Sequence, residues 1–248
     1  MGSLTSRPQY IPLEYTVGWK DKYRKQACNL AMSPVTGPDF PFVIAPLTGS
    51  DAGVATRCYS DVFLNHEPMT RCCSISPELF FPPAQVYVSL CAEDSLSFIA
   101  RDKISRDLAG FILCSDLSTD WSSRDPRMND MLLLFPAITS ILNRLEQYYR
   151  ERYPSGPGES FHIFQVGTAS GFRQLGVAKA LVRTALENAR TRGFSHALAE
   201  CTSPASRGLF YSCGFTVVYE LPFLNFSVDG TCYFKDLPGE ITLMAREL

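Results

Sequence analysis

A glycine-containing turn between an apolar run and an amphipathic helix is the segment of this chain best suited to hold a phosphate group. The apolar run begins at Phe161 and ends at Val166, and the helix follows Arg173-Gln174-Leu175-Gly176-Val177-Ala178. The first N–H groups of a helix have no partner within the helix, and the helix dipole favours negative charge there. Gly176 lets a ligand approach the backbone because it carries no Cβ atom. The turn therefore predicts an anion site, although it is neither a dinucleotide fingerprint nor a P-loop.

The spacing R-x-x-G-x-A at this junction resembles the coenzyme A-binding motif of the GNAT superfamily of acyl-CoA-dependent N-acyltransferases. A second segment, Leu209-Phe210-Tyr211-Ser212-Cys213-Gly214-Phe215, resembles the helix and turn that close the fold of this family. The two motifs occur in the order of the family and at a typical distance. The resemblance covers residues 42–248 and implies acetyl-CoA as the co-substrate.

A third segment points to one branch of that superfamily. Phe63-Leu64-Asn65-His66-Glu67-Pro68-Met69-Thr70 resembles the F-x-x-x-E-P-L segment of insect dopamine and other arylalkylamine N-acetyltransferases. The segment Cys201-Thr202-Ser203-x-x-Ser206 and the C-terminal hairpin are also similar to that branch. The resemblance implies direct transfer of acetyl to a primary amine, without a covalent acyl-enzyme.

Glu67 is the candidate general base. An alkylamine is mostly protonated at neutral pH because its pKa is about 10, and only the neutral amine is nucleophilic. A carboxylate within reach can accept the proton, directly or through water. In the family the glutamate of the E-P segment has this role, so the resemblance assigns it to Glu67. Two alternatives stay open: Glu67 only stabilises the helix end before Pro68, or His66 is the base.

The leaving thiolate needs a proton or a hydrogen bond, for which many GNAT enzymes use a tyrosine four residues before the glycine of the Gly-Phe pair. This chain has Phe210 at that position, and Tyr211 lies about 100° away around the helix. The dopamine N-acetyltransferase branch also lacks the tyrosine and is thought to use two serines near the start of this helix. The resemblance carries their roles to Thr202 and Ser206, of which Ser206 keeps the residue type. Helix capping is the alternative for both.

The predicted coenzyme site joins a strand edge to the start of the helix. Pantetheine resembles a peptide and can pair with an exposed strand, here through the backbone of Gln165, Val166 and Gly167. The pyrophosphate would lie on the backbone at the helix start, with residues Arg173, Gln174, Leu175, Gly176, Val177, Ala178 and Lys179 around it. Lys179 and Arg183 either contact the 3′-phosphate or are solvated charges. The connection at residues 168–172 is longer than in the insect enzymes.

The elements predicted around these residues mix helices and strands. We expect strands at residues 42–47, 95–101, 108–113, 161–166, 196–201, 216–226, 231–234 and 241–245. Helices are expected at residues 20–32, after 48–51 as far as Pro68, at 129–149 with Pro136 near its start or at a kink, from the phosphate turn to Gly193, and at 203–213. Asp229-Gly230 predicts a hairpin turn. This order indicates a mixed α/β chain, and the resemblance implies the GNAT fold, a mostly antiparallel mixed sheet flanked by helices. Residues 1–40 would be an extension and 41–248 the GNAT domain.

Two further segments bear on the substrate. Residues 219–226 are rich in aromatic side chains and lie where the family forms its acceptor pocket, which would suit an aromatic or lipophilic amine. Ordinary core packing is the alternative reading of this segment. His162 and His196 fall in strand patterns and are expected to be core histidines with satisfied hydrogen bonds.

Composition limits the partners and the compartment. The 248 residues are 46% hydrophobic and 19% charged, which is typical of a globular protein with a substantial core. A net charge of −2 argues against nucleic acid, and no apolar run reaches the roughly 20 residues that span a bilayer. Nine cysteines without a C-x-x-C pair indicate free thiols in a reducing, cytoplasmic setting, with no metal site.

These features predict an acetyl-CoA-dependent N-acetyltransferase that acts on a small aromatic or alkyl amine in a ternary complex, as a monomer or weak dimer. One alternative is a peptide or protein N-acetyltransferase. The long helix at 129–149 and the hairpin around Asp229 argue against it, because they suggest a covered pocket. The other alternative is a non-catalytic protein that binds and senses acyl-CoA.

Overall fold

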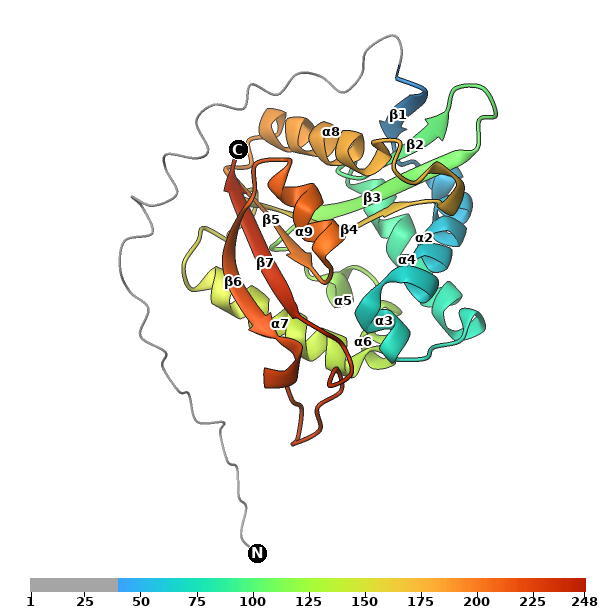
Figure 1. The fold of residues 1–248 in the computed structure, drawn as a ribbon. Helices are drawn as coiled ribbons and strands as arrows, with labels where there is room; N and C mark the ends of the chain where they lie inside the picture. Colours follow the sequence, from blue (N-terminus) through green and yellow to red (C-terminus); the bar gives the residue numbers. More distant parts are fainter. Residues whose placement is uncertain (1–39) are drawn as a thin grey trace, which may run out of the picture. The chain divides into compact units, whose positions relative to one another are not determined.

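A seven-stranded sheet organises residues 40–248, the part of the chain that the computed structural model describes (Figure 1). Its strands are β1 (Phe42–Pro46), β2 (Phe98–Asp102), β3 (Leu108–Asp116), β4 (Ser160–Thr168), β5 (His196–Cys201), β6 (Thr216–Pro222) and β7 (Glu240–Glu247). They lie in the order β1-β2-β3-β4-β5-β7-β6. Only β4 and β5 run parallel, which confirms the predicted mixed and mostly antiparallel sheet.

All the described helices lie between β1 and β6 along the chain. They are α2 (Ala52–His66), α3 (Pro68–Cys72), α4 (Pro77–Glu93), α5 (Trp121–Arg124), α6 (Met128–Leu134), α7 (Pro136–Arg150), α8 (Val177–Thr191) and α9 (Pro204–Tyr211). Three short 3₁₀ turns complete them: η1 (Gly49–Asp51), η2 (Ser170–Phe172) and η3 (Phe223–Asn225). No helix among residues 40–248 is long and apolar enough to cross a membrane.

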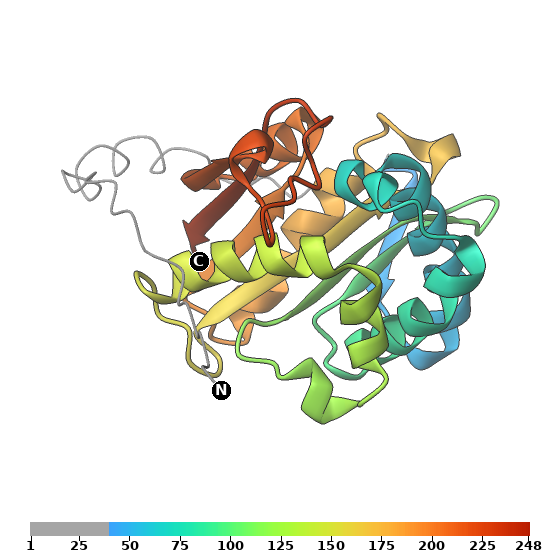
Figure 2. The same cartoon turned by 90° about the horizontal axis from the view of Figure 1, so that it is seen from below.

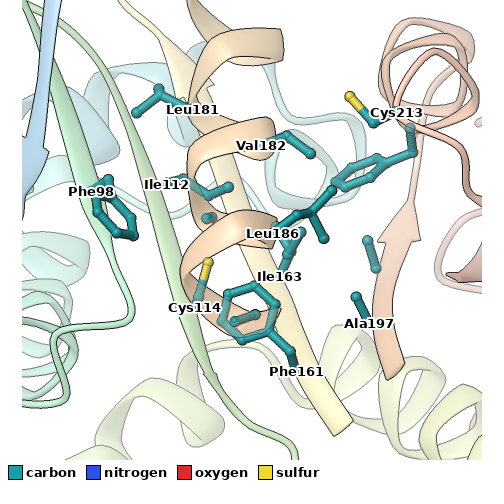
Figure 3. Packing of buried hydrophobic residues seen from close by; sticks show 14 of the residues in the cluster. Phe98, Ile112, Cys114, Phe161, Ile163, Leu181, Val182, Leu186, Ala197 and Cys213 are labelled. Carbon is teal, nitrogen blue, oxygen red and sulfur yellow. The ribbon is translucent and has the colours of Figure 1, made fainter. Parts of the chain in front are cut away.

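One face of the sheet is covered by α8 and α9. The apolar residues of α8 recur at helical spacing, so that Leu181, Val182 and Leu186 all lie on the side that meets the sheet. Figure 3 shows them beside Ile112 of β3 and Ile163 of β4, in one buried cluster. Burial of such side chains stabilises the fold by about 1.5–3 kcal/mol each. The predicted amphipathic helix is therefore present, and it begins at Val177.

The opposite face is covered in two halves. Over β3, α2 and α4 pack together around a second buried cluster that contains Tyr59, Phe80 and Phe111. Over β5 to β7, α7 buries Ile141 and Leu145 in a third cluster (Figure 2). The face between these two halves is where the chain leaves a hollow.

The parallel strands β4 and β5 separate partway along their length. They pair only from Ser160 with His196 to His162 with Leu198. Beyond His162, β4 continues to Thr168 and β5 continues to Cys201 without pairing to each other. The sheet therefore opens in its middle, and both strand ends present backbone and side chains to the gap.

A β-bulge in β4 lies beside this opening. Leu113 of β3 pairs with Gln165 and Cys114 pairs with Ile163, so that Phe164 is the extra residue. Ile163 packs in the cluster under α8, whereas Phe164 packs in the cluster of α2 and α4. Gln165 also turns toward α2, where its Nε2 lies 2.7 Å from the Tyr59 hydroxyl. The bulge thus turns two consecutive side chains to one face of the sheet.

Most predicted elements are present, with the following differences. The strand predicted at residues 216–226 ends at Pro222, and residues 223–225 form η3 instead. The helix α4 was not predicted, because Pro82 and Pro83 inside it remove backbone donors that a helix needs. The helix predicted at 129–149 is two helices, and Pro136 is the first residue of the second. Residues 231–234 form only an isolated bridge at Thr231, although the turn at Asp229 and Gly230 has the expected positive φ values. The helix predicted at 20–32 lies outside the described residues.

The longer connection after β4 has a packing reason. Residues 170–172 form η2, and the Phe172 ring packs edge-on against the Phe42 ring with centroids 5.8 Å apart. The added residues thus make a short turn that is anchored on β1, before the chain enters the segment that leads to α8. The eight described cysteines are all free thiols, as predicted.

Candidate active site

A cavity of about 480 Å³ lies where β4 and β5 separate, on the face covered by α2, α4 and α7. Residues from seven helices (α2 to α7 and α9) and from β3, β4 and β5 line it. The predicted site residues Glu67, Thr202 and Ser206 all belong to its wall, as do Gln165 and Val166. The structure therefore brings three candidate catalytic residues, far apart in sequence, into one enclosed space.

Glu67 lies between α2 and α3, where the chain turns before Pro68. Its backbone is extended, and its carboxylate accepts hydrogen bonds from the N–H groups of Met69 at 3.2 Å and Thr70 at 2.5 Å. Glu67 is thus the N-cap of α3, which satisfies two donors that the helix itself cannot. The same carboxylate also accepts a hydrogen bond from the Thr202 hydroxyl at 2.8 Å. Structural capping and a place in the cavity wall are therefore combined in one side chain.

Thr202 is not the cap of α9. Ser203 is the N-cap: its hydroxyl accepts a hydrogen bond from the Ser206 N–H at 3.2 Å. The alternative of capping by Thr202 is therefore wrong, because its hydroxyl points to Glu67 instead. A hydrogen bond of this kind fixes the carboxylate that it reaches, and bonds to charged groups contribute about 1.5–3 kcal/mol.

Ser206 lies in the first turn of α9. Its hydroxyl donates to the Ser203 carbonyl oxygen at 2.9 Å and accepts from the Ser203 N–H at 3.2 Å. Ser203 and Ser206 thus form a reciprocal capping box. Ser206 both caps the helix and lines the cavity, so that its proton must leave the Ser203 carbonyl if it is to serve a ligand.

The position that many family members fill with tyrosine has no hydroxyl here. Phe210 is 2% exposed and contributes an apolar surface to the cavity. The neighbouring Tyr211 lies outside the cavity wall, is 46% exposed, and has the Arg207 guanidinium 5.7 Å from its ring centroid. The expected departure at this position is therefore real, and Tyr211 does not replace the missing group.

A buried ion pair that the sequence did not suggest also lines the cavity. His162 of β4 and Glu200 of β5 approach to 2.8 Å between Nε2 and Oε2. Burial acts to lower the pKa of His162, but the adjacent Glu200 carboxylate outweighs burial and raises this pKa above 6.5. His162 has a satisfied hydrogen bond, as predicted for a core histidine, yet it also faces the cavity. Only the parallel register of β4 and β5 shows that these two residues meet.

The aromatic wall of the cavity comes from other residues than predicted. Tyr219 stacks on Tyr148, and Phe223 and Phe226 are buried in the third core cluster. The core alternative for residues 219–226 is therefore correct, and the pocket assignment was wrong. The aromatic residues that line the cavity are Tyr59, Phe63, Phe80, Tyr87, Trp121, Phe135, Phe164 and Phe210. Four of the eight lie on α2 and α4, and the other four lie on α5, on β4, on α9 and between α6 and α7.

The start of α8 has the geometry of an anion site. Gly176 is its N-cap in the left-handed conformation, with φ of 80° and no side-chain cap. The first intrahelical hydrogen bond runs from the Ala180 N–H to the Gly176 carbonyl oxygen at 3.0 Å. The N–H groups of Val177, Ala178 and Lys179 therefore have no intrahelical acceptor. The preceding residues Arg173, Gln174, Leu175 and Gly176 are all exposed.

Gly167 is needed for close packing beneath this segment. A Cβ atom at this position would lie 2.5 Å from two ring carbons of Phe111 and 3.1 Å from Val62. Gly167 and the turn before α8 do not line the cavity; they follow it along the chain, beyond Gln165 and Val166. The candidate coenzyme residues thus run from the cavity wall to the exposed helix start.

Several solved structures share the fold of this chain. The chain is similar to the C-terminal condensation domain of Ebony, solved with beta-alanyl-dopamine, with a TM-score of 0.74, 18% identity, and 84% and 99% of the two chains covered. It is similar to arylalkylamine N-acetyltransferase 2 of Aedes aegypti, with a TM-score of 0.64, 19% identity, and coverage of 83% and 98%. A third similar structure is the polyamine N-acetyltransferase of Drosophila melanogaster, with a TM-score of 0.62, 14% identity, and coverage of 84% and 100%. At these identities the likeness shows the fold.

Sequence comparison identifies the family. A search of curated protein sequences gave no significant match. The profile of the Acetyltransferase (GNAT) family matches residues 67–215, which is more than half of the chain. The matched range begins at the carboxylate in the cavity wall and ends with the Gly214-Phe215 turn after α9. The separated β4 and β5, the glycine turn before α8 and this profile together show that the protein is an acyltransferase that belongs to the Acetyltransferase (GNAT) family.

Proposed function

We propose that the protein transfers the acetyl group of acetyl-CoA to the primary amine of a small aromatic or alkyl amine, directly and within a ternary complex. The observation that carries this proposal is the placement of Glu67, Thr202 and Ser206 around one largely apolar cavity. The cavity leads along β4 toward the free N–H groups at the start of α8. This arrangement offers an amine site and a coenzyme site at the two ends of one strand.

Acetyl-CoA fits the residues after the cavity. Its phosphates would meet the N–H groups of Val177, Ala178 and Lys179, which have no intrahelical acceptor, with Arg173 adding positive charge. Its pantetheine would run along β4 at Gln165, Val166 and Gly167, on the edge that faces β5 but no longer pairs with it. The acetyl end would then face the cavity. A solved acetyltransferase of the same fold from Salmonella typhimurium, with a TM-score of 0.51, contains acetyl-CoA as its cofactor, which supports this assignment.

Glu67 is the proposed proton acceptor. The ammonium form of the acceptor gives a proton to this carboxylate, directly or through water, and the free amine nitrogen attacks the thioester carbonyl carbon. The new C–N bond forms as the C–S bond breaks, and the nitrogen loses its second proton to become the amide. The departing sulfur takes a proton, for which Ser206 is the proposed donor and Thr202 the second candidate, and the proton lost by the nitrogen restores this hydroxyl through water. No covalent bond to the protein forms in this sequence.

The neighbouring folds support an amine of modest size. The Aedes aegypti protein is named for arylalkylamines and the Drosophila melanogaster protein for polyamines. The cavity here has eight aromatic residues in its wall, which suits an acceptor with an aromatic or aliphatic body. A peptide acceptor would need an open groove, whereas α6 and α7 contribute to the wall of this cavity.

The first test is turnover with a panel of amines. Purified protein, acetyl-CoA and aryl, alkyl or polyamine acceptors are mixed, and acetylated product is followed by mass spectrometry together with free coenzyme A. Product with at least one small amine is expected. Coenzyme binding without product from any amine contradicts the proposal and indicates an acyl-CoA-sensing protein.

Glu67→Gln tests the proton acceptor. The amide keeps the size of the side chain but is not a base, so we expect kcat/KM at neutral pH to fall by about 10²–10⁴-fold while coenzyme A binding is kept. Glu78→Gln removes an exposed carboxylate in the first turn of α4 and is the matched control. An unchanged kcat/KM in Glu67→Gln would leave Glu67 with capping as its only role.

A further inference from the structure

The pair of His162 and Glu200 is the most deeply buried charged feature of the cavity. The His162 side chain is 11% exposed and the Glu200 side chain 6% exposed, and both line the cavity wall. A carboxylate so far from water is costly unless charge and hydrogen bonds compensate it. Among the described residues, His162 is the one hydrogen-bond partner of the Glu200 carboxylate.

The charges around the pair are predominantly negative. Five carboxylates belong to the cavity wall: Glu67, Asp116, Asp120, Glu146 and Glu200. No lysine or arginine is among the described residues that line it. Glu146 of α7 is paired with Arg150 at 2.7 Å, and Asp116 and Asp120 accept backbone hydrogen bonds in their own loops. Glu200 thus differs from the others, because a titratable imidazole is its only compensation.

Glu200 and the proposed proton acceptor Glu67 line the same cavity. Thr202, whose hydroxyl donates a hydrogen bond to Glu67, follows Glu200 by two residues, directly after the end of β5. The cavity therefore holds two carboxylates, Glu67 and Glu200, each of which can face a positively charged group of a bound molecule.

We propose that Glu200, held by His162, binds a second cationic group of the acceptor, so that the preferred substrates are amines that carry two positive charges. This inference rests on the proposed acetyl transfer and names the substrate class of that site. One ammonium group lies at Glu67 and becomes acetylated. The other ammonium group stays protonated and lies at Glu200. Its positive charge compensates the buried carboxylate when His162 is neutral.

The state of His162 sets how well Glu200 binds a cation. The groups that face His162 are Glu200 on β5 and, on α7, Glu146 and Arg150. Glu200 and Glu146 favour the protonated imidazole, whereas burial and Arg150 oppose it, and the net effect raises the pKa above 6.5. Below this pKa the imidazolium already neutralises Glu200. Above it the carboxylate is left for the substrate, so that diamine preference increases with pH.

The test compares putrescine with pentylamine, in which a methyl group replaces one ammonium. We expect the ratio of their kcat/KM values to favour putrescine at a pH above the pKa of His162, and to fall about tenfold or more in Glu200→Gln, because a hydrogen-bonded charge pair is lost. Glu187→Gln on the exposed face of α8 is the matched charge control. In His162→Gln the ratio should no longer depend on pH. An unchanged ratio in a folded Glu200→Gln variant overturns the inference.

A binding measurement separates this inference from the proposed function. Calorimetry with putrescine and pentylamine, in the presence of saturating coenzyme A, reports the second-cation site without any chemistry. Selective putrescine binding that is lost in Glu200→Gln supports the site even if no amine is turned over. If Glu200→Gln does not fold, the wild-type ratio decides: a ratio that does not increase as the pH rises through the pKa of His162 counts against the inference.

Discussion

At the scale of single residues, Glu67 has two tasks in this molecule. Its carboxylate caps α3 through two backbone N–H groups and accepts a third hydrogen bond from Thr202. These bonds hold the carboxylate in one orientation, and such preorganisation is what a proton acceptor needs. Because Glu67 is the N-cap, Pro68 occupies the first position of α3. Proline suits that position, since its missing N–H is not needed there.

Thr202→Val tests whether the hydroxyl at 202 orients Glu67. The variant keeps the shape of the side chain and removes one hydrogen bond to a charged group, which contributes about 1.5–3 kcal/mol. We expect kcat/KM for the amine to fall about tenfold or more, with the KM for acetyl-CoA unchanged. Thr202→Ser keeps the hydroxyl and should retain most activity. Equal losses in both variants would show that the methyl group, and not the hydroxyl, matters.

The candidate residues could be predicted from the sequence where a local pattern carried them. Glu67 and Gly176 stand in short motifs, so their neighbours in the chain identify them. His162 and Glu200 stand on two strands and meet only through three pairs of parallel register. No local pattern indicates that meeting. The aromatic residues of the cavity wall were missed for the same reason. They come from α2, α4 and several other elements, and the sequence of one element does not show which others pack against it.

At the scale of elements, the start of α8 joins conformation to binding. Gly176 adopts a φ of 80° just before the helix, and no side chain caps the first N–H groups. Residues with a Cβ atom are strained in this region. The strand and helix on either side were predicted correctly because their apolar periods are long and regular. The helix α4 was not, since packing of Phe80, Tyr87 and Val88 overrides the two prolines within it.

Gly176→Ala tests this helix start. The left-handed backbone makes alanine unfavourable by about 1–2 kcal/mol, and relaxation of the turn would displace the N–H groups that the coenzyme needs. We expect a lower urea midpoint and weaker coenzyme A binding by calorimetry. Gly171→Ala is the control, since Gly171 lies in η2 with no positive φ and with nothing within 4 Å of an added Cβ. Equal behaviour of the two variants would contradict a special role for Gly176.

At the scale of the whole molecule, three buried clusters surround a sheet that is open in its middle. The cluster under α8 and the two on the opposite face share the strands but have separate sets of side chains. The cavity lies at the margin between these clusters, where β4 and β5 no longer pair with each other. Rigid elements thus position the site, while the apolar contacts that stabilise the fold lie around it.

The thiols offer a measurement of this packing. Cys91, Cys114, Cys201 and Cys213 are buried, and burial raises the pKa of Cys201 to about 12. Because the thiolate is the reactive form, these four should resist iodoacetamide in the native protein and react in denaturant. Among the cysteines of residues 40–248, exposed Cys72 should react first. Mass spectrometry of labelled peptides gives the pattern, and rapid native labelling of the four would contradict the described core.

The hydrogen bond between Thr202 and Glu67 has a consequence for biosynthesis. The two residues are 135 positions apart, so the ribosome adds Glu67 long before its partner Thr202. A nascent chain from which β5 has not yet emerged lacks Thr202, Ser206 and one side of the cavity. Acyl transfer therefore cannot begin before β5 and α9 have been synthesised. Chains that terminate before β5 should not consume acetyl-CoA.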